Sequence, residues 1–90
     1  MQLRQESKEV LWACVEWVRQ TARENPEQWI CFRWICSIYQ QRFGRDFHQS
    51  QLGMLAKGGL LRHDDLVRGG TRRYYRIADL PLAERVVGSL

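Results

Sequence analysis

Hydrophobic residues in the first half of the chain recur at intervals of three and four, the spacing of one face of an α-helix. The first such stripe predicts a helix that has Ser7 as its N-cap and runs to about Glu24. Asn25-Pro26 follow the stripe, and a proline cannot continue a helix. The first helix is therefore expected to end before Pro26, although Pro26 could equally open another turn with Asn25 as its cap.

The next segment, up to Gly44, shows the same spacing in a run that is rich in aromatic and β-branched residues. We predict a second helix over residues 32–43, which a short strand at Trp29–Cys31 can precede. Gly44 is expected to end this helix in the left-handed conformation. The apolar patterns of the two helices place Trp17 and Trp34 in the core.

A third helix is predicted over about residues 47–57. Asp46 and Gln49 form a D-x-x-Q version of the capping box at its start, and Gly58-Gly59 stop it. Its entry is expected to be closed by Phe47 as a hydrophobic staple residue, and its buried stripe comprises Leu52, Leu55 and Ala56. Two helices joined by such a short break form the skeleton of a helix-turn-helix unit.

Two runs with the character of β-strands follow, at residues 60–63 and 72–77. They flank a segment that contains Gly69-Gly70, which predicts a β-hairpin with a basic tip. Alternation in the second run places Tyr75 toward the core and Tyr74 on the opposite face, where it is the better candidate for an exposed contact.

The last segment, from Asp79 onward, predicts a short helix with Pro81 in its first turn. The predicted fold class is thus mainly α with a small β-hairpin (α+β). Three helices form the core, the hairpin follows them, and a short C-terminal helix completes a single domain over residues 1–90.

The charge of the chain is concentrated in one segment. The formal net charge is +4, and residues 45–76 alone carry seven Lys and Arg against three Asp and Glu. Such a concentration is typical of a surface that binds a polyanion, although a solvated basic face without a partner is the alternative. The chain also has four Trp, three Tyr and three Phe, more large rings than one small core holds, which indicates an interface.

Other classes of function find little support in the composition. The three cysteines lie in apolar surroundings, which favours small buried side chains in a reducing compartment over a disulfide framework. No segment is apolar enough to span a membrane and the N-terminus is not a signal peptide, so we expect a cytoplasmic, nucleoid-associated protein without a membrane partner. Only His48 and His63 are available for acid–base chemistry, and no nucleophile is placed with them, so we expect no enzyme and no cofactor.

A metal sensor can be imagined from Cys31, Cys36, His48 and the His63-Asp64-Asp65 run. However, two cysteines separated by four residues do not have the spacing of a structural zinc site. We therefore expect no metal and interpret the cysteines as buried apolar side chains.

Residues 52–77, LGMLAKGGLLRHDDLVRGGTRRYYRI, resemble part of the winged helix-turn-helix regulators of the MarR-, ArsR- and PadR-like families. In those families a recognition helix ending L-x-x-L-x-x-x-G-L-[LI] leads into an Arg-rich glycine wing closed by a Tyr-x-[LI] strand. The first two helices agree with these families only in length and pattern. The resemblance implies a winged-helix fold with its recognition helix near residues 47–57 and its wing near residues 60–77.

In helix-turn-helix proteins the second helix enters the major groove of DNA, with residues near its N-terminus reaching base edges. A glutamine can pair bidentately with adenine, and a serine can donate or accept a hydrogen bond. A glycine inside a helix costs about 1 kcal/mol relative to alanine, which close approach to DNA or to another backbone would offset. From the helix and its approach we expect DNA contacts by Arg45, His48, Gln49, Ser50, Gly53 and Lys57. The alternative is that these are solvated polar residues.

The wing is expected to lie along the phosphates or to insert an arginine into a minor groove. Its predicted contacts are Arg68, Gly69, Gly70, Thr71, Arg72, Arg73 and Arg76. A surface hairpin that is merely basic is the competing interpretation.

Trp12 lies with Glu16, Arg19 and Arg23, away from the apolar stripe of the first helix, which predicts a dimer interface at Trp12. We expect a sequence-specific double-stranded DNA-binding protein, a homodimeric transcriptional regulator of bacterial or mobile-element origin, with no small-molecule effector evident. The chief alternative, favoured by the four tryptophans, is a winged-helix protein-interaction module in a larger complex without DNA contact. Structured RNA or non-B-form DNA is a third alternative.

Overall fold

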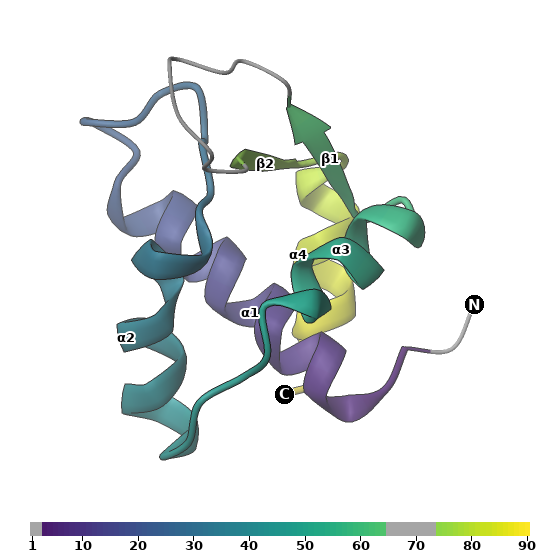
Figure 1. Cartoon of the computed structure of the whole chain (residues 1–90). Helices are drawn as coiled ribbons and strands as arrows, with labels where there is room; N and C mark the ends of the chain where they lie inside the picture. Colours follow the sequence, from purple (N-terminus) through teal and green to yellow (C-terminus); the bar gives the residue numbers. More distant parts are fainter. Residues whose placement is uncertain (1–2, 65–73) are drawn as a thin grey trace.

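Four helices and a two-stranded antiparallel hairpin form the part of the chain that the structure, a computed structural model, describes: residues 3–64 and 74–90 (Figure 1). In chain order they are α1 Gln5–Gln20, α2 Phe32–Phe43, α3 Ser50–Lys57, β1 Leu61–Asp64, β2 Tyr74–Ile77 and α4 Leu80–Val87. The predicted fold class, mainly α with a small hairpin and a short C-terminal helix, is confirmed. The order of elements is compatible with winged-helix topology.

Helix α1 is the centre of the fold, because α2, α3 and α4 all pack against it (Figure 1). The buried surface of α1 is therefore broader than one narrow stripe. Its fully buried residues are Val10, Leu11, Ala13, Cys14 and Val15. At about 25 cal/mol per Å² of apolar surface removed from water, this shared core is the main stabilising contribution to the fold.

The bounds predicted for the first helix are wrong at both ends. The helix begins at Gln5, and Arg4 is its N-cap, whereas Ser7 lies inside the helix and is 3% exposed. Its hydroxyl donates to Gln51 Oε1 at 2.9 Å instead of capping the helix. The helix ends at Gln20, four residues early, and the hydroxyl of Thr21 donates to the Trp17 carbonyl oxygen at 2.7 Å.

Helix α2 has the bounds that the sequence predicts, and Gly44 ends it in the left-handed conformation with φ 69°. The predicted short strand before α2 is reduced to one residue, Ile30. The backbone N–H and carbonyl of Ile30 each form a 2.8 Å hydrogen bond with the backbone of Tyr75. Ile30 thus forms a single antiparallel β-bridge to the free edge of β2.

Helix α3 begins at Ser50, three residues later than the capping-box pattern predicts, and Asp46 is not its cap. The reason is Phe47, whose ring is 6% exposed and lies 5.1 Å from the Phe32 ring and 4.8 Å from the Tyr39 ring, centroid to centroid. Burial of a phenylalanine side chain contributes about 1.5–3 kcal/mol, which outweighs the cap. The backbone before Ser50 therefore follows the path that places Phe47 in the core.

In the hairpin, Leu61 pairs with Ile77 and Asp64 with Tyr74. Tyr75 is buried, as predicted, and Tyr74 is half-buried rather than exposed because its ring lies between Trp29 and Trp34, with centroids 5.8 and 5.6 Å away.

Trp17 packs against the core, as predicted, although it is half-buried; Trp34 is also half-buried and is not part of the buried core. Their rings stack on each other at 5.5 Å and an interplanar angle of 24°. The Trp17 indole N–H also donates to the Trp29 carbonyl oxygen at 2.9 Å. These rings form the outer side of an aromatic cluster between α1, α2 and β2.

Helix α4 starts as predicted: the Asp79 carboxylate accepts the N–H of Leu82 at 3.1 Å, and Pro81 lies in the first turn. Ala83 and Val87 are its buried residues, and α4 packs against α1. In the described ranges, no helix combines the length and the apolar character that crossing a membrane requires.

Candidate nucleic-acid interface

The two faces of α3 differ sharply. Leu52 and Leu55 are 1% and 0% exposed and anchor the helix in the core. The opposite side presents Ser50, Met54 and Lys57, all exposed, with the half-buried Gly53 between them. Helical spacing of three and four places these four residues on one face. As predicted, Ser50 and Lys57 face outward, while Met54 is an outward residue that the sequence analysis did not select.

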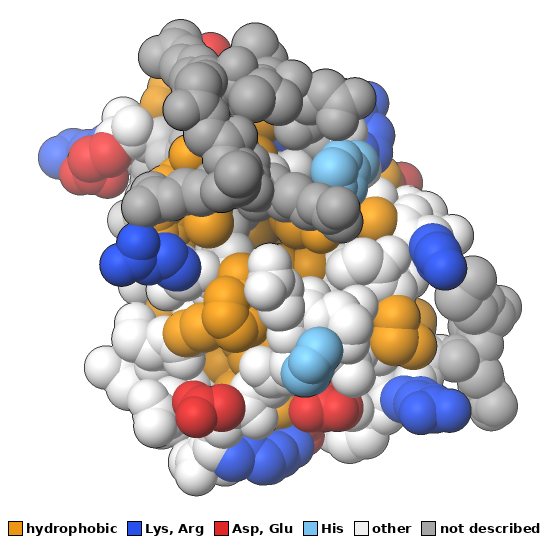
Figure 2. All heavy atoms as spheres, viewed as in Figure 1, with side chains coloured by type: hydrophobic (Ala, Val, Ile, Leu, Met, Phe, Trp, Pro, Cys, Tyr) orange, Lys and Arg blue, Asp and Glu red, His pale blue; other side chains and the backbone are white. Residues whose placement is uncertain are grey.

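Figure 2 shows the side of the molecule that carries α3. Lys and Arg side chains lie around the edge of this side together with Asp and Glu side chains, and uncharged polar and hydrophobic side chains occupy much of its middle.

His48, the residue before the N-cap Gln49, binds the first backbone N–H of α3. Its Nδ1 accepts the backbone N–H of Ser50 at 3.1 Å and lies 2.8 Å from the Ser50 hydroxyl oxygen. A neutral imidazole that accepts at Nδ1 carries its proton on Nε2. Because Nδ1 accepts, Nε2 is the donor of this ring. The His48 side chain is exposed at the start of α3. Gln49, the next residue, is exposed as well.

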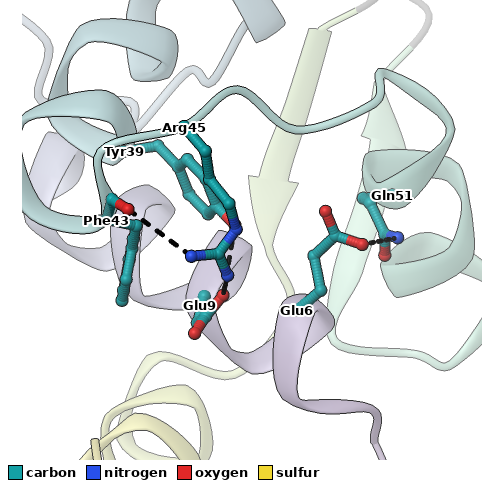
Figure 3. Close-up of polar contacts among 6 residues, drawn as sticks. All are labelled: Glu6, Glu9, Tyr39, Phe43, Arg45 and Gln51. Atoms are coloured by element: carbon teal, nitrogen blue, oxygen red, sulfur yellow. Dashed lines mark hydrogen bonds and ion pairs between the residues drawn. The ribbon is translucent and has the colours of Figure 1, made fainter.

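Arg45 lies inside the protein's own network rather than on the open face of α3. Its guanidinium forms an ion pair with the Glu9 carboxylate, which also accepts the Tyr39 hydroxyl at 3.1 Å (Figure 3). The Glu9 side chain is only 9% exposed, whereas that of Arg45 is 52% exposed. A buried carboxylate destabilises a fold unless it is paired and hydrogen-bonded. Arg45 and Tyr39 supply these interactions and so offset the cost of burying Glu9 on α1.

The Tyr39 hydroxyl stays protonated in this network. Burial, and next the hydrogen bond to Glu9, raise the pKa of Tyr39 to about 12. The phenol therefore remains a donor to Glu9 throughout the neutral range of pH. Tyr39 thus ties α2 to α1, and Arg45 ties the segment between α2 and α3 to α1.

A second set of contacts fixes α3 itself. The Gln51 side-chain N–H₂ donates to Glu6 at 3.1 Å (Figure 3), and its oxygen accepts the Ser7 hydroxyl at 2.9 Å. Both ends of this amide are thus engaged by α1, which sets the direction of α3. Glu6, Glu9 and Gln51 were not predicted from the sequence, because no spacing rule links polar residues that lie thirty or more positions apart.

The wing contacts predicted at the hairpin tip lie outside the described residues: Arg68, Gly69, Gly70, Thr71, Arg72 and Arg73. Arg76 is described and is half-buried, with its Nε donating to the Glu27 carbonyl oxygen at 2.9 Å and its guanidinium 5.3 Å from the Trp29 ring centroid. Arg62, which is exposed, lies opposite Arg76 in the strand pairing.

Trp12 is less open than a free interface residue would be. It is half-buried, its ring meets the Phe43 ring edge-on at 5.8 Å, and the Arg42 guanidinium lies 4.2 Å from its centroid. Part of its apolar surface is therefore used within the protomer, between α1 and α2.

The chemistry of the cysteines is that of packed side chains. Burial raises the pKa of the Cys14 thiol to about 12 and also raises that of Cys36, whose Sγ lies 3.0 Å from the Phe32 carbonyl oxygen. All three cysteines are free. Within residues 3–64 and 74–90, no three His, Cys, Asp or Glu side chains are grouped so as to hold a metal ion.

Comparisons with protein-family models, with curated proteins and with solved structures found no match for this chain.

Proposed function

We propose that this protein binds double-stranded DNA sequence-specifically, with α3 in the major groove and the hairpin against the sugar–phosphate backbone. One observation carries the proposal: α3 is anchored by Leu52 and Leu55 while its opposite face, with Ser50 and Lys57, is exposed beside the hairpin. The major groove of B-DNA admits an α-helix, and residues near the N-terminus of that helix reach the base edges.

The residues that face outward have the chemistry that this role needs. Gln49 and Ser50 lie at the start of α3, where an amide can pair with adenine and a hydroxyl with either kind of base edge. Lys57 at the far end and Arg62 on β1 are exposed cations for phosphates. Arg45 contributes chiefly through its ion pair with Glu9, which holds the segment before α3 in place. The exposed part of its side chain remains available to a DNA phosphate.

The charge of the chain supports the same partner. The segment from residue 45 to residue 76, which contains α3 and the hairpin, carries a net charge of +4, the same as the net charge of the whole chain. We further propose a homodimeric transcriptional regulator of bacterial or mobile-element origin, because a two-fold pair of such small modules would double the contacts and read two spaced half-sites.

Binding to duplex DNA should be strongly salt-dependent. If about four to six basic residues per protomer meet phosphates, log K should fall with log salt by about 0.9 for each phosphate neutralised. Electrophoretic mobility shift with a random duplex library, repeated across salt concentrations, measures this slope. Absence of binding to any duplex at ~50 mM salt would remove the DNA proposal.

Two single variants divide this binding into its parts. Lys57→Ala should weaken all duplexes alike and lower the salt slope by about one, since one phosphate contact is lost. Gln49→Ala, the matched control, should cost about 1–3 kcal/mol at the preferred site and leave the slope unchanged. Both side chains are exposed, so the fold should be unaffected.

A protein-interaction module is the second candidate function, and the aromatic cluster favours it. Trp17, Trp29, Trp34 and Tyr74 are all half-buried and lie together on the outside of α1, α2 and β2. Aromatic residues are enriched in the cores of protein interfaces. A protein that binds no duplex at low salt would promote this candidate.

The dimer proposal rests on the exposed part of Trp12. Light scattering at micromolar concentration should give twice the monomer mass of 10.7 kDa. Trp12→Ala should shift that mass toward the monomer while the helical circular dichroism persists, because the ring is only half-buried. Lys57→Ala should leave the mass unchanged. A wild-type protein of monomer mass, or a Trp12→Ala protein that unfolds, would contradict an interface at this residue.

A further inference from the structure

Met54 stands out on the outer face of α3. Its side chain is 47% exposed and is the one large hydrophobic side chain in the described ranges that is exposed. It lies in the middle of the face, one turn after Ser50 and one turn before Lys57. Methionine at this point contributes little to the core, which Leu52 and Leu55 already fill from the other side. Its exposed side chain is therefore available to a partner outside the core.

The neighbouring Gly53 is equally unexplained by the fold. A Cβ at Gly53 would meet no heavy atom within 4 Å beyond its own helix, so close packing within the protein does not require a glycine. Its backbone is not left-handed either, in contrast to Gly44 and Gly59, whose φ angles are 69° and 79°. Since glycine weakens a helix interior relative to alanine, α3 carries a bare patch of backbone that costs stability.

We infer that Gly53 and Met54 form a thymine-reading site, in which the Met54 thioether contacts the 5-methyl group of a thymine and Gly53 lets the helix backbone approach the bases. This inference rests on the proposed function, because it assumes that α3 lies in the major groove. The methyl group of thymine is the apolar group on the major-groove edge of the base pairs, and apolar side chains recognise it by contact. A methionine suits that contact, since its unbranched, polarizable side chain adapts to an irregular apolar surface.

The arrangement of the face supports a division of labour. Gln49 and Ser50 at the start of α3 supply hydrogen-bonding groups, which suit adenine and other polar base edges. Met54 has only weak hydrogen-bonding capacity, so the base that it faces must be recognised by shape and apolar contact. Without a Cβ on Gly53, the helix can descend further into the groove beside Met54.

The test removes single methyl groups from the DNA. Duplexes are selected from a random library with the wild-type protein, and each thymine of a selected site is replaced in turn by deoxyuridine. At least one replacement should weaken wild-type binding about fourfold, the factor that corresponds to ~0.8 kcal/mol for one buried methyl group. For Met54→Ala that replacement should change the affinity by less than about 1.5-fold, whereas Met54→Leu should keep the sensitivity.

Gly53→Ala tests the approach of the backbone. The variant should melt at a temperature roughly 4 °C higher, because alanine is the better helix former and has open space for its Cβ. Its affinity for the selected duplex should fall about tenfold, since the added methyl group holds the helix away from the bases. A stabilised protein that binds less tightly separates this effect from a loss of folding.

The outcomes distinguish the two proposals. A wild-type protein that binds no duplex overturns the proposed function and this inference with it. Specific binding in which deoxyuridine has no effect at any thymine, or has the same effect in wild type and Met54→Ala, overturns the inference alone. A Gly53→Ala protein that binds as tightly as wild type likewise overturns the inference, because the helix backbone then makes no close approach to the bases at this residue.

Discussion

Leu55→Ala should lower the free energy of unfolding by about 2–5 kcal/mol, the usual cost of truncating a fully buried leucine. Leu55 is 0% exposed and, with Leu52, joins α3 to the core around α1. Alanine at this position leaves a cavity that the surrounding side chains fill only in part. Urea denaturation followed by circular dichroism measures the change, and the slope of the transition should stay the same.

Met54→Ala is the matched control for this prediction. The two residues are neighbours on one helical turn and have side chains of similar size, but Met54 is 47% exposed. Its truncation should change the free energy of unfolding by less than about 0.5 kcal/mol. Equal costs at the two positions would mean that α3 is rotated about its axis relative to the structure, and the assignment of its outer face would then be wrong.

The protein should lose stability at alkaline pH, beginning near pH 9. The pKa values of Cys14 and Tyr39 are raised by burial from 9.0 and 10.0 to about 12. Above pH 9 the unfolded chain releases these protons first, so the folded state binds more protons and its stability falls as pH rises toward 12. Cys14 alone contributes on the order of 4 kcal/mol to this loss, because each pKa unit corresponds to about 1.36 kcal/mol.

Thermal unfolding at a series of pH values from below 9 to about 12 tests this prediction. Cys14→Ala and Tyr39→Phe each remove one titrating group, and the double variant should lose much less stability over the same range. Some loss should persist, because burial also raises the pKa of Cys36. An alkaline decline that is as steep in the double variant as in wild type would show that other groups cause it.

The sequence predicted well what depends on neighbours along the chain. The bounds of α2, the left-handed Gly44 and the place of Pro81 in the first turn of α4 follow from local spacing and from single residues. The start of α3 was missed because a local signal and a tertiary contact compete there. The capping pattern at Asp46 favours an early start, whereas burial of Phe47, which depends on Phe32 and Tyr39 far along the chain, favours a late one.

The candidate site was predictable to the extent that helical phase fixes it. Once Leu52 and Leu55 are known to be buried, the outward positions of Ser50 and Lys57 follow from the spacing. Met54 was not predicted as an outward residue, because methionine is usually buried, whereas its position on the helix places it on the exposed face of α3. The contacts of Glu9 with Arg45 and of Glu6 with Gln51 are long-range pairings, and their energies depend on desolvation that a single sequence does not reveal.

The separation of the two faces of α3 has a consequence for how this protein could change over evolution. Gln51 and Leu55 tie the helix to α1 and the core, whereas Met54 and Lys57 point away from both. Exchanges of exposed side chains such as these two alter folding stability by only about 0.5 kcal/mol or less. Descendants of this chain can therefore acquire new binding preferences by drift at those positions without first acquiring compensating stabilising mutations.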